Sequence, residues 1–419
     1  MLDMQYIRDN SGLVKKATKD KGFDASVIDE LLAIDEKHRV LIGEVETIRR
    51  DRNILNDQLK KNRTNELINQ SRALKAELDK KEPELDALAQ QVKELALKIP
   101  NPSATDVLVG KEEDNEVIRQ VGTIKKFDFP VRDHLELGML TKTLDLTAGT
   151  KVAQSGFYYV KGLGAMLEFA LVQYALNKLA KHGFTPVITP NVANEHSVVG
   201  CGFQARSDKE RQIYHIDGED LDLIGTAEIT LVGQHQDTTF NASDLPLKYA
   251  GYSYCYRYEK GSYGRDVRGI IRVHEFRKIE MVVFCLPEES DAIHEKLREI
   301  EEEIWTELEV PYQLIKMATG DLGNAATRKY DIEAWMPSQN KYREVTSTSN
   351  TTDFQARRLG IKVRRNGGTE YLHTLNGTAF ALGRAMIAIY ENYQNEDGSI
   401  TVPTVLQPFM GATIIPVQK

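Results

Sequence analysis

The feature that most constrains this chain of 419 residues is a pair of heptad-spaced apolar stripes in its first quarter. One stripe runs from Leu31 to Leu59 and the other from Leu67 to Ile99, each at alternating steps of three and four residues. That spacing is typical of the seam of a coiled coil. The polar run "KKNRTN" separates the stripes, so the sequence predicts an antiparallel helical hairpin over about residues 29–99.

The predicted hairpin is longer than a compact domain needs. At about 1.5 Å per residue each helix would run roughly 50 Å, so we expect the hairpin to project as an arm. Pro83 lies inside the second helix and is expected to kink or interrupt it. The run "IPNPSATD" ends the arm with two prolines and turn formers. We therefore predict one domain over residues 1–106 and another over 107–419. A role of the arm in oligomerisation or spacing stays open.

The rest of the chain has a different pattern. Helical stretches such as "LGAMLEFALVQYALNKLAKHG" alternate with short β-rich runs such as "FTPVITP" and "KIEMVVFC". Because these runs lack a regular βαβ order, they predict an α+β domain on a mainly antiparallel sheet flanked by helices. No GxGxxG run opens a βα turn and no GxxxxGK[ST] run occurs, so Rossmann and P-loop chemistry are not expected.

Composition limits the location and the partners. Nothing approaches the 18 apolar residues of a membrane span, and the N-terminus lacks an apolar signal region. The three cysteines are far apart and the nine histidines show no ligand spacing. We therefore expect a cytoplasmic protein with no membrane partner and no zinc. The net charge of −8 argues against a nucleic-acid binder, yet "QARRLGIKVRRNGG" holds five basic residues and no acid. This run could be a solvated loop or a face for a polyanion.

The run "YRYEKGSYGRDVRGIIRVHEFRKIE" combines charges with β-type ends and a glycine-rich centre. Arg257 and Glu259 lie two residues apart, which predicts that they share one face of a strand. Arg272 and Phe276 are expected on the returning strand. An arginine could bind a phosphate bidentately and Phe276 could hold an aromatic ring. An exposed charged hairpin is the alternative interpretation.

Acidic side chains suggest sites for an ammonium group and a metal ion. Glu280 lies at the end of the same run and could bind an ammonium group, and Thr226 and Glu228 lie two residues apart in "GTAEITL". Glu344 and Ser347, in "REVTSTSN", supply hard oxygen ligands suited to Mg²⁺ or Mn²⁺. Alone, neither run would identify a site.

Three runs together resemble the motifs of class II aminoacyl-tRNA synthetases. "GFTPVITP" resembles the first motif, with its proline at Pro190, and the charged run resembles the second. "LGRAMIAIYENYQ" resembles the third, with Arg384 at the start of a buried helix, where a guanidinium needs an anionic partner. From end to end the chain is similar to seryl-tRNA synthetase, since the arm, "TGDLG", "YREVTSTSNTTDFQARR" and "HTLNGTAFALGR" follow in that family's order.

The resemblance implies roles for individual residues. Serine would bind Thr226, Ala227, Glu228, Glu280 and Thr378. Arg257 and Arg384 would be the catalytic arginines, on the α- and γ-phosphates of ATP. Glu344 and Ser347 would hold Mg²⁺. The ATP-binding residues would be Arg257, Tyr258, Glu259, Arg272, Val273, Phe276, Glu344, Val345, Thr346, Ser347 and Arg384.

The resemblance also implies a reaction and partners. Serine would be activated by ATP to seryl-adenylate and then transferred to serine tRNA, and similar enzymes also serylate selenocysteine tRNA. The family is homodimeric, and its arm binds the long variable arm of the tRNA. The candidate tRNA contacts are Arg49, Arg50, Arg52, Lys60, Lys61 and Arg63.

The chain departs from the family pattern at the pocket. It reads "TSTSN" and "NGT" where the family commonly reads "SSCSN" and "NGS", so Thr346, Thr348 and Thr378 are unusual. Two alternatives to the ligase stay open. One is a synthetase paralogue that passes an activated amino acid to a non-tRNA acceptor, and the other is a catalytically inactive coiled-coil interaction protein.

Overall fold

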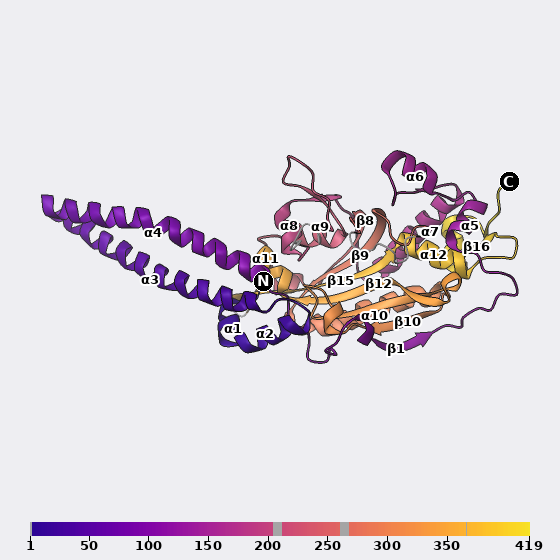
Figure 1. The fold of residues 1–419 in the computed structure, drawn as a ribbon, viewed down its shortest axis with the longest axis horizontal. Coiled ribbons are helices and arrows are strands. Elements are labelled where there is room, and N and C mark those ends of the chain that lie inside the picture. Colours follow the sequence, from indigo (N-terminus) through magenta and orange to yellow (C-terminus); the bar gives the residue numbers. More distant parts are fainter. Residues whose placement is uncertain (1, 204–211, 260–267, 366) are drawn as a thin grey trace. The chain divides into compact units, whose positions relative to one another are not determined.

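The structure, a computed structural model, describes residues 2–203, 212–259, 268–365 and 367–419. The chain divides into two compact units, Met1–Pro102 and Ser103–Lys419. Figure 1 shows the first unit as helices and the second as a sheet with helices around it.

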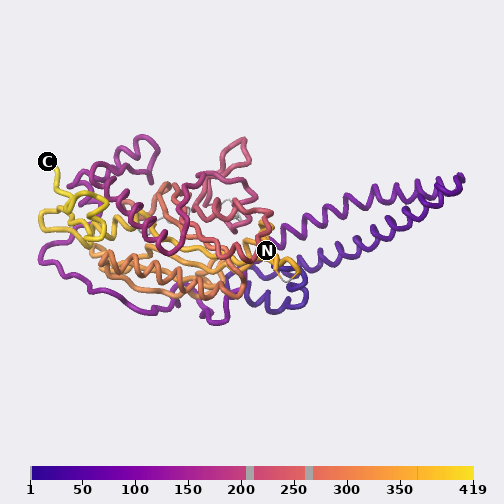
Figure 2. The backbone as a smooth tube through the Cα atoms, turned by 180° about the vertical axis from the view of Figure 1, so that it is seen from behind, coloured from indigo at the N-terminus to yellow at the C-terminus, as the bar shows by residue number. Residues whose placement is uncertain are grey.

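The first unit is a long helical hairpin with two short helices at its base. The helices are α1 (Met4–Asp9), α2 (Ser11–Asp20), α3 (Ser26–Lys61) and α4 (Asn65–Leu97). In Figures 1 and 2 the two long helices α3 and α4 run side by side, and the predicted hairpin is confirmed. Leu41, Val45 and Leu78 are buried along the seam, so the heptad stripe supplies the core of the hairpin.

The expected interruption at Pro83 is wrong, because α4 continues through this residue. A proline removes one N–H and crowds the carbonyl four residues earlier, which belongs here to Asp79. Pro83 and Asp79 are both exposed, so water can bond that carbonyl. Leu78 and Leu85 pack against α3 on either side of the proline and hold the helix together.

An eight-stranded sheet forms the centre of the second unit. Every neighbouring pair of strands is antiparallel except the edge pair β4 and β8, so the predicted α+β architecture on a mainly antiparallel sheet is confirmed. In spatial order the strands are β1 (Glu116–Val121), β10 (Tyr312–Lys316), β11 (Arg328–Met336), β12 (Lys341–Thr352), β15 (His373–Ala381), β9 (Glu275–Cys285), β8 (Leu247–Tyr256) and β4 (Thr185–Ile188).

Three long helices cover the sheet. They are α7 (Leu163–Lys181), α10 (Ser290–Glu307) and α12 (Leu382–Asn392). Helix α10 packs on β12 and β15, and α12 packs on β9, β11 and β15. Trp305 of α10 and Tyr390 of α12 are fully buried in the core. The apolar residues of these helices therefore fix the central strands on which the charged runs lie.

Smaller elements complete the second unit. The helices are α5 (His134–Leu140), α6 (Leu146–Ala153), α8 (Glu195–Gly200), α9 (Ala227–Gly233), α11 (Phe354–Leu359) and α13 (Gln407–Met410). The short strands are β2 (Leu144–Asp145), β3 (Tyr159–Val160), β5 (Val192–Ala193), β6 (Asp222–Leu223), β7 (Thr239–Asn241), β13 (Lys362–Arg365), β14 (Gly368–Tyr371), β16 (Ile400–Thr401) and β17 (Ile414–Ile415). Across the described ranges, no helix is long and apolar enough to span a membrane.

The basic run after residue 355 is largely regular structure, so the solvated loop, one of the two interpretations left open, does not apply. Arg358 lies in α11, where its guanidinium stacks on the Phe354 ring at 3.9 Å. Arg357 pairs with Asp353 at 2.6 Å, and Arg365 at the end of β13 pairs with Glu288 and Glu370. Since these arginines pack locally or pair with acids, the run supplies internal contacts of the second unit.

Candidate active site

In the charged run that ends β8 and begins β9, the two predicted site arginines, Arg257 and Arg272, lie outside the strands. Arg257 follows directly after β8, and its backbone N–H donates to the backbone carbonyl of His274 at 3.0 Å. Glu259 has a left-handed backbone with φ +49°, and Arg272 precedes β9. The expectation that Arg257 and Glu259 share a strand face, with Arg272 on the returning strand, is therefore wrong. The centre of the predicted hairpin loop, 260–267, lies outside the described residues.

Arg272 and Glu259 nevertheless meet. Arg272 Nη1 donates to Glu259 Oε2 at 3.0 Å. This contact links the segment that follows β8 to the segment that precedes β9. His274 Nδ1 contacts the carbonyl of Arg257 at 3.0 Å. His274 thus holds the backbone beside Arg257.

A cavity of about 470 Å³ lies between this run, β12, β15 and the start of α12. Ala227 and Tyr258, both predicted ligand contacts, are not part of its lining. Ala227 belongs to the apolar core, and the Tyr258 ring stacks on Tyr214 at 3.8 Å. The predicted residues that do line the cavity are Thr226, Glu228, Arg257, Glu259, Arg272, Val273, Phe276, Glu280, Glu344, Val345, Thr346, Ser347, Thr378 and Arg384.

A buried carboxylate, Glu228, lies in the first turn of α9. The Thr226 hydroxyl caps this helix by accepting from the Glu228 N–H at 3.2 Å. Glu228 Oε1 accepts from Gln355 Nε2 at 2.6 Å and from Asn376 Nδ2 at 2.9 Å. Burial and the negative charge of Glu280 raise the pKa of Glu228 to about 7. Glu228 is therefore half protonated near neutral pH and sensitive to any cation that enters the cavity.

A second carboxylate, Glu280, lies on β9 opposite Thr378 of β15. Glu280 is 2% exposed, and its Oε2 contacts Lys278 Nζ at 2.6 Å and accepts from the Thr378 hydroxyl at 3.1 Å. Lys278 was not predicted as a site residue, although a strand places residues two apart on one face. Gln355 and Asn376 were not predicted either, because their contacts with Glu228 come from distant elements and leave no local signal.

Guanidinium groups line another part of the cavity. Arg384 Nη1 donates to the Glu344 carbonyl at 2.9 Å and lies 3.2 Å from Glu344 Oε1, which is the anionic partner expected for this residue. Desolvation in the cavity would raise the pKa of Glu344, but the Arg384 charge lowers it to about 2. The guanidinium carbon of Arg257 lies 5.3 Å from the centroid of Phe276, and Arg257 Nε donates to the Gly225 carbonyl at 3.2 Å.

The predicted metal ligands lie next to each other on β12. Ser347 Oγ donates to Glu344 Oε1 at 3.3 Å, and Glu344 is ionised. Within the described part of the chain, no group of three or more His, Cys, Asp or Glu side chains forms a metal cluster. Glu344 and Ser347 fit Mg²⁺, because this ion often takes only one or two protein oxygens and completes its shell with phosphates and water.

The arrangement suits a small ligand that carries both an ammonium group and phosphates. Carboxylates attract the ammonium group, and guanidinium groups bind phosphate oxygens bidentately. Cys201 also lines the cavity, but burial and the charge of Glu228 raise its pKa well above the ordinary value. Its thiol is therefore a poor nucleophile. The described residues favour catalysis by positioning and charge stabilisation.

Two family models match the chain. The model of the seryl-tRNA synthetase N-terminal domain matches residues 1–103. The model of the tRNA synthetase class II core domain (G, H, P, S and T) matches residues 212–393. The helical hairpin and most of the cavity lining thus fall within two separate family domains.

Similar proteins extend over the whole chain. A serine–tRNA ligase of Rubrobacter xylanophilus is 45% identical over 99% of both chains. The structure of seryl-tRNA synthetase from Pyrococcus horikoshii complexed with ATP is 37% identical, covers 100% of both chains and has a TM-score of 0.93. The cytoplasmic serine–tRNA ligase of Naegleria fowleri in complex with AMP is 30% identical, with a TM-score of 0.86 over 99% of this chain and 97% of that one. This chain therefore belongs to the seryl-tRNA synthetase family of class II aminoacyl-tRNA synthetases, and the resemblance is confirmed.

Proposed function

We propose that this chain activates L-serine with ATP and transfers the seryl group to the 3′ end of serine tRNA. The observation that carries the proposal is one cavity that joins the carboxylates Glu228 and Glu280 to the guanidinium groups of Arg257 and Arg384. Its full-length relatives are named serine–tRNA ligases, and one similar structure was solved with ATP. Selenocysteine tRNA is a further acceptor in this proposal.

Serine binds at the carboxylate end of the cavity. Its ammonium group lies near Glu228 and Glu280, and its hydroxyl lies near Thr226 and Thr378. Alanine cannot pair with the buried polar groups that serve this hydroxyl, so it is rejected strongly, on the order of 10⁴-fold. The methyl group of Thr378 narrows the pocket against the larger threonine. Ala227 contributes through its backbone position at the start of α9.

ATP binds at the guanidinium end. Adenine stacks on Phe276, which Arg257 covers in this structure, so nucleotide binding moves the Arg257 guanidinium from the ring toward the α-phosphate. Arg384 binds the γ-phosphate. The remaining nucleotide contacts in the proposal are Glu259, Arg272, Val273, Glu344, Val345, Thr346 and Ser347, all of which line the cavity.

The reaction proceeds in two displacements. A serine carboxylate oxygen forms a bond to the α-phosphorus of ATP, the bond from that phosphorus to the bridging oxygen breaks, and pyrophosphate leaves. A terminal ribose hydroxyl of the tRNA then attacks the seryl carbonyl, and AMP leaves. Arg257 and Arg384 hold the phosphates in line and neutralise their charge. Glu344 and Ser347 would hold Mg²⁺, which supplies further positive charge to the phosphates.

The two parts of the chain divide this work. Residues 1–106 bind tRNA and residues 107–419 carry the chemistry. The candidate tRNA contacts lie on the distal half of α3 and at the turn after it, where Arg49 pairs with Glu82 at 2.7 Å and Lys60 with Asp57 at 2.8 Å. These exposed pairs are weak, so phosphates can compete for the cations.

The proposal includes a homodimer in the cytoplasm. Ile188 of β4 and Phe169 of α7 are 85% and 63% exposed, and their two elements contact each other. Large apolar side chains gathered on one surface favour burial against a second copy. All three cysteines are unpaired and buried, which fits a reducing compartment. A paralogue with a non-tRNA acceptor is less well supported, because the N-terminal domain of the family is present.

Serine-dependent exchange of pyrophosphate into ATP tests the chemistry. Wild-type protein is expected to catalyse exchange with serine and not with alanine or threonine. Arg257→Ala is expected to lower the exchange rate by about 10²–10³-fold, because a positioned phosphate ligand is lost. The matched control is Arg268→Ala, since Arg268 is 63% exposed and pairs with Asp133. Absence of exchange by the wild type, or equal rates for both variants, would contradict the proposal.

The pH dependence of serine binding tests the role of Glu228. The pKa of Glu228 is raised to about 7, and its ionised form attracts the serine ammonium group. The KM for serine should therefore fall about tenfold between pH 6 and pH 8, as the ionised fraction grows. The KM for ATP should not follow this change. Glu228→Gln is expected to bind serine weakly and without this pH dependence; a Gln variant with the wild-type profile would exclude the assignment.

Charging of tRNA tests the arm. Combined replacement of Lys60, Lys61 and Arg63 by alanine is expected to raise the KM for serine tRNA about tenfold, because phosphate contacts are lost. Pyrophosphate exchange should remain at the wild-type rate. Combined replacement of Lys37, Arg39 and Lys93, three exposed cations near the base of the hairpin, is the charge-matched control. The arm assignment fails if wild-type protein charges a tRNA without its variable arm as well as the intact tRNA.

A further inference from the structure

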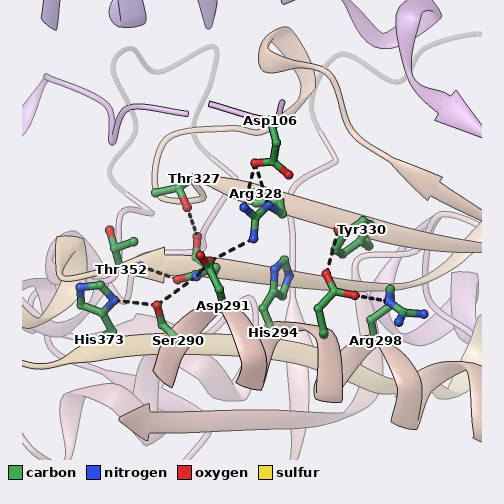
Figure 3. Close-up of polar contacts among 12 residues, drawn as sticks. Asp106, Ser290, Asp291, His294, Arg298, Thr327, Arg328, Tyr330, Thr352 and His373 are labelled. Atoms are coloured by element: carbon green, nitrogen blue, oxygen red, sulfur yellow. Dashed lines mark hydrogen bonds and ion pairs between the residues drawn. The ribbon is translucent and has the colours of Figure 1, made fainter. Parts of the chain in front are cut away.

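Helix α10 presents polar side chains to the back of the strand that carries the predicted metal ligands. Figure 3 shows Ser290 and His294 of this helix beside the sheet. Ser290 Oγ accepts from Asn350 Nδ2 at 3.3 Å, and His294 Nε2 contacts the Thr348 carbonyl at 3.1 Å. Both partners lie on β12, two residues apart. Successive polar side chains of α10 thus contact alternate residues of β12.

Glu301 continues this series toward the cavity. It follows His294 by seven residues, which places both on one helix face. The Thr346 hydroxyl, two residues before Thr348 on β12, donates to Glu301 Oε2 at 3.5 Å. The side chain of Glu301 is fully buried at 0% exposure. The series therefore ends with a carboxyl group directly behind the residues that line the cavity.

A glycine of β15 makes room for this carboxyl. A Cβ atom at Gly377 would lie 3.0 Å from Glu301 Oε1 and 3.2 Å from Thr348 Oγ1. The neighbours of Gly377 in the strand, Asn376 and Thr378, point to the other face, where they bond Glu228 and Glu280. The Glu301 carboxyl therefore lies against the backbone that presents both contacts to the amino-acid pocket.

Burial of a carboxyl group at this position lowers the stability of the folded protein. Within the described residues, Oε1 of Glu301 has no hydrogen-bond partner, which is rare for a buried polar atom. Burial, and then the charges of Glu280 and Asp331, raise the pKa of Glu301 well above its usual value. Desolvation thus favours the neutral form of the carboxyl, which would add no negative charge behind Glu280. Packing alone would be served better by an apolar side chain.

We propose that Glu301 is a positioning residue of the amino-acid pocket, whose carboxyl fixes the backbone at Gly377 and thereby sets Asn376 and Thr378 for serine. The inference rests on the proposed serine site. Two of the residues that depart from the family pattern, Thr346 and Thr348, lie in the same cluster, which links these departures to the support of the pocket.

Three variants of the full-length chain test this role in serine-dependent pyrophosphate exchange. Glu301→Ala is expected to raise the KM for serine about tenfold, because the pocket loses its alignment, and to leave the KM for ATP unchanged. Glu301→Gln keeps the shape and the neutral state and should restore the wild-type KM for serine. Glu302→Ala is the matched control, since Glu302 is a buried glutamate of α10 that pairs with Arg119 and Arg298. It should lower thermal stability without a selective effect on serine.

The inference is overturned if Glu301→Ala leaves the KM for serine unchanged, or changes the values for serine and ATP alike. If Glu301→Gln does not restore the KM for serine, a neutral group of the same shape is not sufficient, and this result would also contradict the inference. Should Glu301→Ala not fold, Gly377→Ala presses a methyl group against the same carboxyl and must give the same serine-selective defect. If the wild type shows no serine-dependent exchange, the proposed function fails instead.

Discussion

Two carboxylates, Glu228 and Glu280, share one desolvated pocket, and the surrounding structure must offset their mutual repulsion. Each carboxylate accepts hydrogen bonds from neutral donors, and Lys278 places a cation 2.6 Å from Glu280. The raised pKa of Glu228 shows that this compensation is incomplete before a ligand binds. A substrate ammonium group would complete it. Under the proposal, the pocket binds an amino acid because its own electrostatics are unfavourable without a cation.

Strand register and helix packing keep these charged groups in place. The antiparallel pairing of β9 with β15 sets Thr378 opposite Glu280, and α10 supports β12 and β15 from behind. Arg384 begins a helix whose remaining side chains are mostly buried, so its guanidinium is held against Glu344 by the apolar core. The chemistry needs no activated side-chain nucleophile under this account. It depends on distances that a rigid sheet can maintain, as expected for phosphoryl transfer.

The sequence predicted those parts of the fold and site that have local signals. Heptad spacing revealed the α3–α4 hairpin, and the family resemblance brought out Arg257, Glu280 and Arg384, which share the cavity. Of the kink or interruption predicted at Pro83, the interruption is wrong, because the helix continues where water can bond the exposed carbonyl. The strand geometry of the charged run was also wrong, since β8 ends one residue before Arg257. Contacts such as Gln355 with Glu228 join distant elements, and single-sequence periodicity carries no information on them.

A crystal structure with a non-hydrolysable seryl-adenylate analogue tests the central claim most directly. The account predicts the ammonium group of the analogue between Glu228 and Glu280, its hydroxyl beside Thr378, and its phosphate mimic bound by Arg257. Adenine should stack on Phe276 after the guanidinium has left the ring. An analogue whose ammonium group lies away from both carboxylates, or whose phosphate mimic makes no contact with Arg257, would contradict the account.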